Sequence, residues 1–168
     1  MAHPSLFDHP LINAGSVERR TYQERVAENA LRGNTLVSIP TGLGKSLIAA
    51  LVAAKRLEQY PEKRVVILAP TRPLVEQHYR TFKRLLRIDP QESACVTGHT
   101  PPNDRSRSWT TRLIVSTPQV FVNDLIAGKI QLDDISLLVF DEAHRAVGDY
   151  AYTYIGERYG KVSRGLVL

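Results

Sequence analysis

The sequence predicts an α/β domain in which a doubly wound, mostly parallel sheet is flanked by helices. Two observations support this prediction. Apolar runs alternate along the chain with segments of helical period, which is the pattern of βαβ crossovers. The runs at residues 65–68 and 137–140 are continuously apolar instead of alternating with polar residues. Parallel strands have this composition when helices cover both faces of their sheet.

The expected elements follow from these runs in chain order. We expect strands at residues 35–39, 64–69, 93–97, 112–116 and 136–140. We expect helices at residues 23–31, 45–60, 73–86 and 118–127. Residues 98–108 contain two prolines and an Asn-Asp pair, so they are expected to form a loop. The last four residues resemble the start of another buried strand, which needs partners, so the chain is expected to be a piece of a longer protein.

Composition limits the possible classes of protein. With 168 residues the chain is long enough for one domain with a full core. A single cysteine, Cys95, excludes a disulfide framework and a cysteine-based metal site. No apolar run approaches the ~20 residues that cross a bilayer, and the N-terminus is not a secretory signal. We therefore expect no membrane partner and a cytoplasmic location, or a nuclear one in a eukaryote.

The chain is basic, with a net charge of +5 that comes mostly from arginine. Arginine suits phosphate recognition because its planar guanidinium donates two parallel hydrogen bonds. A charge of this size is compatible with a nucleic-acid partner, and equally with a solvated basic surface.

The first local signal is a glycine-rich run between an expected strand and an expected helix. The run is Ile39-Pro40-Thr41-Gly42-Leu43-Gly44-Lys45-Ser46. Glycine lets a backbone approach phosphate closely, and the following helix directs its free N–H groups and positive dipole end at the same phosphates. Lys45 is expected to reach the β- and γ-phosphates, and the Ser46 hydroxyl to bind magnesium. The general pattern has glycine where this chain has Ile39, while the Pro-Thr-Gly-x-Gly-Lys-Ser variant is complete. The simpler interpretation is a turn without a ligand.

The second signal is the run Asp141-Glu142-Ala143-His144, directly after an apolar strand. In open α/β sheets, ligands bind at the carboxyl edge of the strands, where these side chains emerge. Asp141 is expected to hold magnesium, and Glu142 to orient or deprotonate the attacking water. An acidic pair at a strand end can also be a plain helix cap.

These two runs resemble the DEAH-box type of helicase superfamily two. The extension Arg145-Ala146-Val147-Gly148-Asp149-Tyr150-Ala151-Tyr152 is similar to the group that contains archaeal Hef and the Fanconi anaemia M translocase. The resemblance implies a RecA-like P-loop fold that uses ATP and Mg²⁺, with His144 coupling the nucleotide site to the next motif. It also implies that Gln23 selects adenine. The residues that it assigns to nucleotide binding are Arg20, Gln23, Thr41, Gly42, Leu43, Gly44, Lys45 and Ser46.

Further positions match motifs that contact one nucleic-acid strand in this group. They are Thr71 and Arg72, Gly98, and Thr117 and Gln119. Thr71 and Thr117 stand where a strand ends and a helix begins, so they can offer hydroxyls and N–H groups to phosphate. Both threonines can equally be plain helix caps. The four other histidines have no metal-ligand spacing and are expected on the surface.

The resemblance also implies what lies outside this chain. Residues 1–33 form an N-terminal segment with the adenine motif, and residues 34–168 form a RecA-like core. The group uses a second motor domain, which supplies an arginine finger, and this domain is absent here. The leading hypothesis is the ATP-binding domain of an ATP-dependent DNA helicase or translocase that acts on branched or forked DNA. The alternatives are a related ATPase dependent on double-stranded RNA, and a nucleotide-binding scaffold without turnover.

Overall fold

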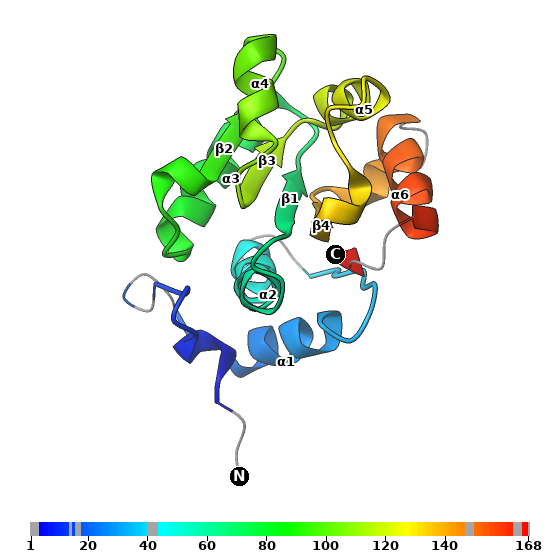
Figure 1. Ribbon diagram of the computed structural model, residues 1–168. Helices are drawn as coiled ribbons and strands as arrows, with labels where there is room; N and C mark the ends of the chain where they lie inside the picture. Colours follow the sequence, from blue (N-terminus) through cyan, green and yellow to red (C-terminus); the bar gives the residue numbers. More distant parts are fainter. Residues whose placement is uncertain are drawn as a thin grey trace.

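Five parallel strands form the sheet in the computed structural model, which describes residues 4–13, 15, 18–39, 44–146, 150–162 and 166–167. The strands are β1 (Arg64–Leu68), β2 (Ser93–Val96), β3 (Leu113–Ser116), β4 (Ile135–Phe140) and β5 (Leu166–Val167). Their spatial order is β2-β3-β1-β4-β5 (Figure 1). The sheet is parallel throughout, as the continuously apolar runs predict.

Helices cover both faces of this sheet. They are α1 (Thr21–Ala30), α2 (Lys45–Gln59), α3 (Arg72–Leu85), α4 (Pro102–Ser108), α5 (Pro118–Ile126) and α6 (Tyr150–Val162), with 3₁₀ turns η1 (Leu6–Asp8), η3 (Pro90–Glu92), η4 (Leu132–Asp134) and η5 (Ala143–Ala146). Helix α1 lies on the outside of α2 (Figure 1). In the described part of the chain no helix combines the length and apolar character needed to cross a bilayer.

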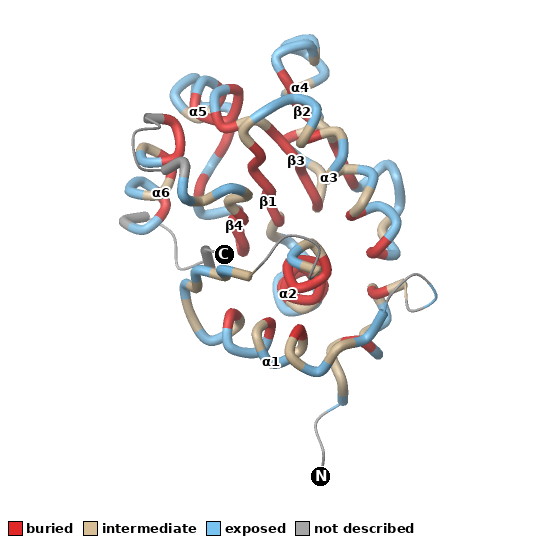
Figure 2. Tube along the Cα trace, turned by 180° about the vertical axis from the view of Figure 1, so that it is seen from behind, coloured by how far each residue is buried: buried red, intermediate tan, exposed pale blue. Residues whose placement is uncertain are grey.

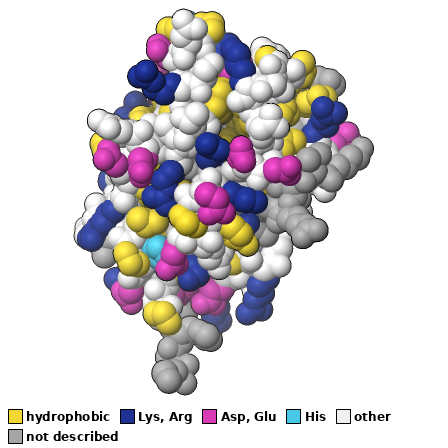
Figure 3. Space-filling view, in the orientation of Figure 1, with side chains coloured by type: hydrophobic (Ala, Val, Ile, Leu, Met, Phe, Trp, Pro, Cys, Tyr) yellow, Lys and Arg dark blue, Asp and Glu magenta, His cyan; other side chains and the backbone are white. Residues whose placement is uncertain are grey.

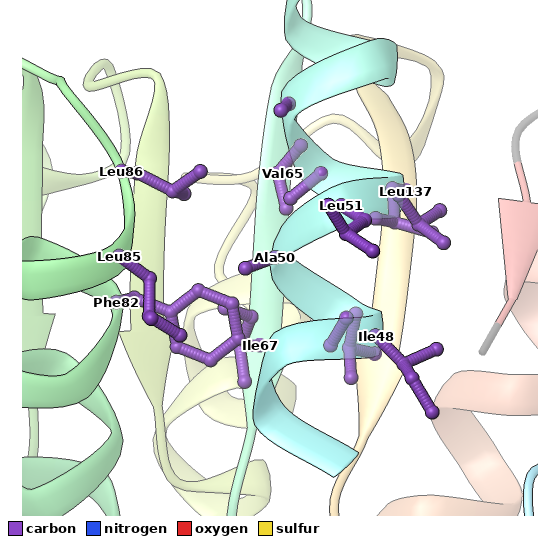
Figure 4. Packing of buried hydrophobic residues seen from close by; sticks show 14 of the residues in the cluster. Ile48, Ala50, Leu51, Val65, Ile67, Phe82, Leu85, Leu86 and Leu137 are labelled. Atoms are coloured by element: carbon purple, nitrogen blue, oxygen red, sulfur yellow. The ribbon is translucent and has the colours of Figure 1, made fainter. Parts of the chain in front are cut away.

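The core has two halves because successive strand residues face opposite sides of the sheet. On one side, Val65 and Ile67 of β1 pack with α2 and α3 (Figure 4). On the other side, Val66 and Leu68 pack with α5 and α6. The strands are buried along most of their length between these layers (Figure 2). The sheet is therefore rigid, and its carboxyl edge is a fixed platform for the loops that follow β1 to β4.

Two expected elements differ from the structure. Residues 35–39 do not form a strand, although Val37 and Ile39 pack against the core and Leu36 is exposed. The side chains alternate in exposure as in a strand, but residues 35–39 belong to no strand in the described part of the chain. The expected loop at 98–108 contains helix α4, and α6 occupies a segment for which the sequence indicated no element.

Helix α4 is fixed by a buried carboxylate on α5. Asp124 is 2% exposed and accepts hydrogen bonds from Arg105 Nε at 3.1 Å and from Trp109 Nε1 at 2.7 Å. Arg105 Nη2 adds a third bond at 3.3 Å. A proline in the first turn starts the helix, and this cluster holds it against the domain.

We expect Asp124→Ala to lower the free energy of unfolding by about 3–5 kcal/mol, because it leaves the Arg105 charge and the Trp109 N–H without their buried partner. Urea unfolding measures the change. Asp104→Ala is the matched control, since Asp104 lies on the exposed side of α4. A loss below about 1 kcal/mol, the usual range for surface sites, would contradict this role.

Candidate nucleotide and nucleic-acid site

The carboxyl edge of the sheet brings the start of α2 close to the end of β4. Gly44 caps α2 with φ +82°, a left-handed conformation that favours glycine. Lys45 is the first residue of α2, and its side chain is exposed. Its ammonium acts through space on the carboxylate of Asp141 and lowers the pKa of that group. Lys45 is thus near enough for its charge to act on Asp141, and the roles of both residues stay predictions.

Asp141 is held by its main chain and by its side chain. Its N–H donates to the carbonyl of Leu68 at 2.8 Å, and its own carbonyl accepts from the Tyr152 hydroxyl at 2.7 Å. Its carboxylate Oδ2 lies 2.7 Å from Nε2 of His78. Burial raises the pKa of this carboxyl, but the bond from His78, the backbone N–H of Glu142 and Lys45 together lower it below its ordinary value. Asp141 is therefore an ionised acceptor at neutral pH.

Glu142 has an unusual backbone. Its φ is +56°, the one positive value among the described residues other than glycine. Such a conformation costs about 1–2 kcal/mol for a residue with a side chain, and it recurs at functional sites. The Glu142 carboxylate is partly exposed and lies 3.2 Å from Nε2 of His144, which is itself exposed. Glu142 directly precedes the 3₁₀ turn η5 in this left-handed conformation, and the catalytic role of the acidic pair stays a prediction.

Gln23 lies against the glycine that starts α2. A side chain at position 44 would overlap the Gln23 amide nitrogen. Gln23 is 3% exposed, and its Oε1 is buried with no hydrogen-bond partner in the described part of the chain. Arg20 is the N-cap of α1 and pairs with Glu18 at 3.3 Å. The structure therefore places Gln23 beside the phosphate loop, and adenine selection stays a prediction.

Three of the expected nucleotide-binding residues, Thr41, Gly42 and Leu43, lie outside the described residues. Ser46 is described and half-buried in the first turn of α2. Its role as a magnesium ligand stays a prediction.

The expected nucleic-acid contacts lie along the same edge, over the half of the sheet opposite β5. Gly98 follows β2, Thr117 follows β3 and Thr71 follows β1, and these three strands are neighbours. The Thr71 hydroxyl accepts from the N–H of Leu74, so it caps α3 as the simpler interpretation predicted. Thr117 occupies the cap position of α5 without a side-chain cap bond.

The two polar side chains of this group are engaged within their own helices. Arg72 Nε donates to Glu76 at 2.7 Å, and Gln119 Nε2 donates to Asn123 at 3.1 Å. Both pairs are exposed, where such contacts are worth less than about 1 kcal/mol and exchange readily for a ligand. The contacts of these residues with a nucleic-acid strand stay predictions.

Sequence reasoning assigned no role to His78 or to Tyr152, although Tyr152 lies in the run that resembles the family, and the surface positions expected for His78 and His9 were wrong. The His78 side chain is 17% exposed and that of His9 is 8% exposed. A signal for His78 was present, because it falls on the apolar stripe of α3 with Val75, Phe82 and Leu85. His99 is exposed as expected, and His3 lies outside the described residues.

Comparison with known proteins identifies the family of this chain. The family model for DEAD/DEAH box helicases matches residues 20–162. The ATP-dependent DNA helicase mph1 of Neurospora crassa is 41% identical over 94% of this chain, and the DEAD-box ATP-dependent RNA helicase FANCM of Arabidopsis thaliana is 40% identical over 84%. The chain spans 14% and 11% of the lengths of these two relatives.

Comparison with a solved structure identifies the fold. The crystal structure of the Pyrococcus furiosus Hef helicase domain matches with a TM-score of 0.88 and 44% identity over 94% of this chain, which covers 33% of that domain. The RecA-like fold and the resemblance to the Hef and Fanconi anaemia M group are thereby confirmed. The chain belongs to the DEAD/DEAH box helicase family.

Proposed function

We propose that this chain is the ATP-binding motor domain of an ATP-dependent helicase or translocase that acts on branched or forked DNA. The observation that carries the proposal is the placement of two elements: α2, which begins at Lys45 after the left-handed Gly44, packs against β4, which is followed by the ionised Asp141. A cation for phosphate and a carboxylate for Mg²⁺ are the two fixed charges that a phosphoryl-transfer site needs.

The residues fit Mg-ATP in three respects. The first turn of α2 offers free N–H groups and a positive dipole end to phosphate. A side chain on Gly44 would fill the space beside Gln23, which has an unpartnered amide oxygen in the described part of the chain. Asp141 is held ionised, as a magnesium ligand must be. Bound Mg²⁺ supplies charge neutralisation on the β- and γ-phosphates.

The remaining roles belong to this chain's own groups. Lys45 binds the β- and γ-phosphates, and Ser46 and Asp141 hold the cation. Glu142 orients the attacking water and accepts its proton. Arg20, Gln23, Thr41, Gly42 and Leu43 complete the nucleotide pocket, and His144 couples it to neighbouring motifs.

A second motor domain is part of the proposal, with residues 1–33 as the adenine segment and 34–168 as the first core. The chain's small share of its relatives' lengths supports a longer protein. We expect the 168-residue chain alone to bind nucleotide weakly and not to unwind DNA. Steady DNA-stimulated ATP turnover by this chain would contradict that expectation.

The names of the relatives include both DNA and RNA helicases, so the substrate needs a direct test. ATP turnover of the full-length protein is measured with forked DNA and with duplex RNA. Stimulation by the fork supports the proposal, and stimulation by duplex RNA alone supports the second candidate. The scaffold alternative predicts no turnover with either nucleic acid. A thermal-shift assay with Mg-ATP tests it further, since the absence of a shift in the full-length protein would favour the scaffold.

The exposed face of α3 and the segment directly after it could add contacts to those expected with the nucleic-acid strand. They carry four exposed basic side chains, Arg80, Lys83, Arg84 and Arg87. In the described part of the chain Arg80, Lys83 and Arg87 make no ion pair. Figure 3 shows that Lys and Arg side chains are interspersed with Asp and Glu on one face of the molecule.

We expect the combined replacement of Arg80, Lys83 and Arg87 by glutamine to weaken the binding of single-stranded DNA by the full-length protein. The loss should be equal for all DNA sequences, because these side chains are proposed to contact phosphates. The slope of log affinity against log salt should become shallower by about 0.7 for each phosphate that the protein no longer neutralises. Fluorescence anisotropy at several salt concentrations measures both quantities. Glutamine at Arg25, Arg32 and Lys129 makes the same charge change at other exposed positions. Equal effects of the two triple variants would show that only net charge matters.

A further inference from the structure

The contact between His78 and Asp141 joins helix α3 to the predicted cation site. Nε2 of His78 lies 2.7 Å from Oδ2 of Asp141. The two side chains are 17% and 25% exposed, so water screens the contact only in part. None of the sequence motifs includes His78, and the proposed roles above do not use it.

The direction of this hydrogen bond follows from the chemistry of its partners. An ionised carboxylate can only accept, so the proton lies on Nε2 of His78, which donates. The carboxylate has roughly four acceptor positions. His78 and the N–H of Glu142 account for two of them, which leaves the carboxylate the capacity to bind a cation as well.

The backbone of Asp141 is fixed independently of His78. Its N–H is bonded to Leu68 O, and the Tyr152 hydroxyl donates to both Asp141 O and Leu68 O. Tyr152 is 1% exposed, which anchors this junction in the core. The main-chain hydrogen bonds thus fix the position of the Asp141 backbone, and the bond to His78 fixes the orientation of its carboxylate.

His78 itself is fixed by α3. It lies about two turns from the Thr71 cap, on the stripe that contains Val75 and Phe82, both buried. The ring of His78 is 6.4 Å from that of Phe82. A shift of α3 therefore moves the Nε2 donor relative to the carboxylate.

We propose that His78 is a positioning residue that orients the Asp141 carboxylate for Mg²⁺ and makes α3 part of the nucleotide site. This inference rests on the proposed function, in which Asp141 holds the cation. Hydrogen-bond partners of metal ligands typically contribute about 10–100-fold in metal affinity. A purely structural role would change the stability of the domain and leave the affinity for the cation unchanged.

The test is Mn²⁺ binding to the full-length protein in the presence of a non-hydrolysable ATP analogue, measured by electron paramagnetic resonance. His78→Leu keeps most of the packing and removes the donor, and we expect it to weaken Mn²⁺ binding about 10–100-fold. His78→Gln keeps an N–H donor and should recover most of the affinity. Thermal unfolding checks each variant, and H78A replaces the leucine variant if that variant does not fold.

The matched control is His9→Leu. His9 is also largely buried, and its Nε2 makes a 2.9 Å contact with Glu58, on the side of the domain covered by α2. It should lose stability while its Mn²⁺ affinity is retained. Equal Mn²⁺ affinity in the wild-type and H78L proteins would overturn the inference alone. A wild-type protein that binds no Mn²⁺ with the nucleotide would contradict the proposed function as well.

Discussion

Lys45→Ala in the full-length protein is expected to lower ATP turnover by roughly 10²–10³-fold while the domain stays folded, the range found when one fixed electrostatic group is removed from a reacting centre. The Lys45 side chain is exposed and lies at the edge of the sheet where its charge acts on Asp141. Alanine removes the only part of the residue that can reach the phosphates.

The fold should tolerate this change. Lys45 begins α2, alanine is the best helix former, and surface substitutions cost within about 0.5 kcal/mol. Circular dichroism and thermal unfolding check the fold, and phosphate release measures turnover. Lys55→Ala is the control, because Lys55 lies on the same helix and pairs with Glu58 at 3.0 Å, far along α2 from Gly44. Unchanged turnover in the Lys45 variant would reject the site assignment.

The strands could be predicted because burial dictates their composition. Val65–Leu68 and Leu137–Phe140 are apolar on both faces, and the structure buries them between two helical layers. Residues 35–39 show the limit of this argument. Their side chains alternate in exposure as in a strand, but strand formation also requires a hydrogen-bonded neighbour, which local composition does not reveal.

Helix α4 and the groups around Asp141 could not be predicted for a related reason. Local composition favours a loop at residues 98–108, and a contact from a distant helix, through Asp124, overrides it. The place of His78 on the apolar stripe of α3 indicated burial, but its partner at the end of a distant strand could not be deduced from the sequence. The motif residues could be selected because glycine-rich and acidic runs are local patterns, whereas a contact such as that of His78 with Asp141 depends on the tertiary structure.

Glu142→Gln is expected to lower the rate of hydrolysis strongly and to leave nucleotide binding intact. Glutamine has nearly the same shape but cannot accept the proton of the attacking water. General-base catalysis contributes about 10²–10⁴-fold, so turnover should fall by that factor. Both residues carry a Cβ, so the strained φ of +56° costs the same in each, and the stability should not change.

The two site variants are distinguishable by binding. Lys45→Ala should weaken both nucleotide binding and turnover, whereas E142Q should lower turnover alone, as measured with a fluorescent ATP analogue and by phosphate release. Glu62→Gln, an exposed position after α2, controls for the loss of one carboxylate. Weakened binding in E142Q would mean that Glu142 acts on the cation or phosphates. Wild-type turnover in E142Q would mean that Glu142 is not the group that accepts the proton of the attacking water.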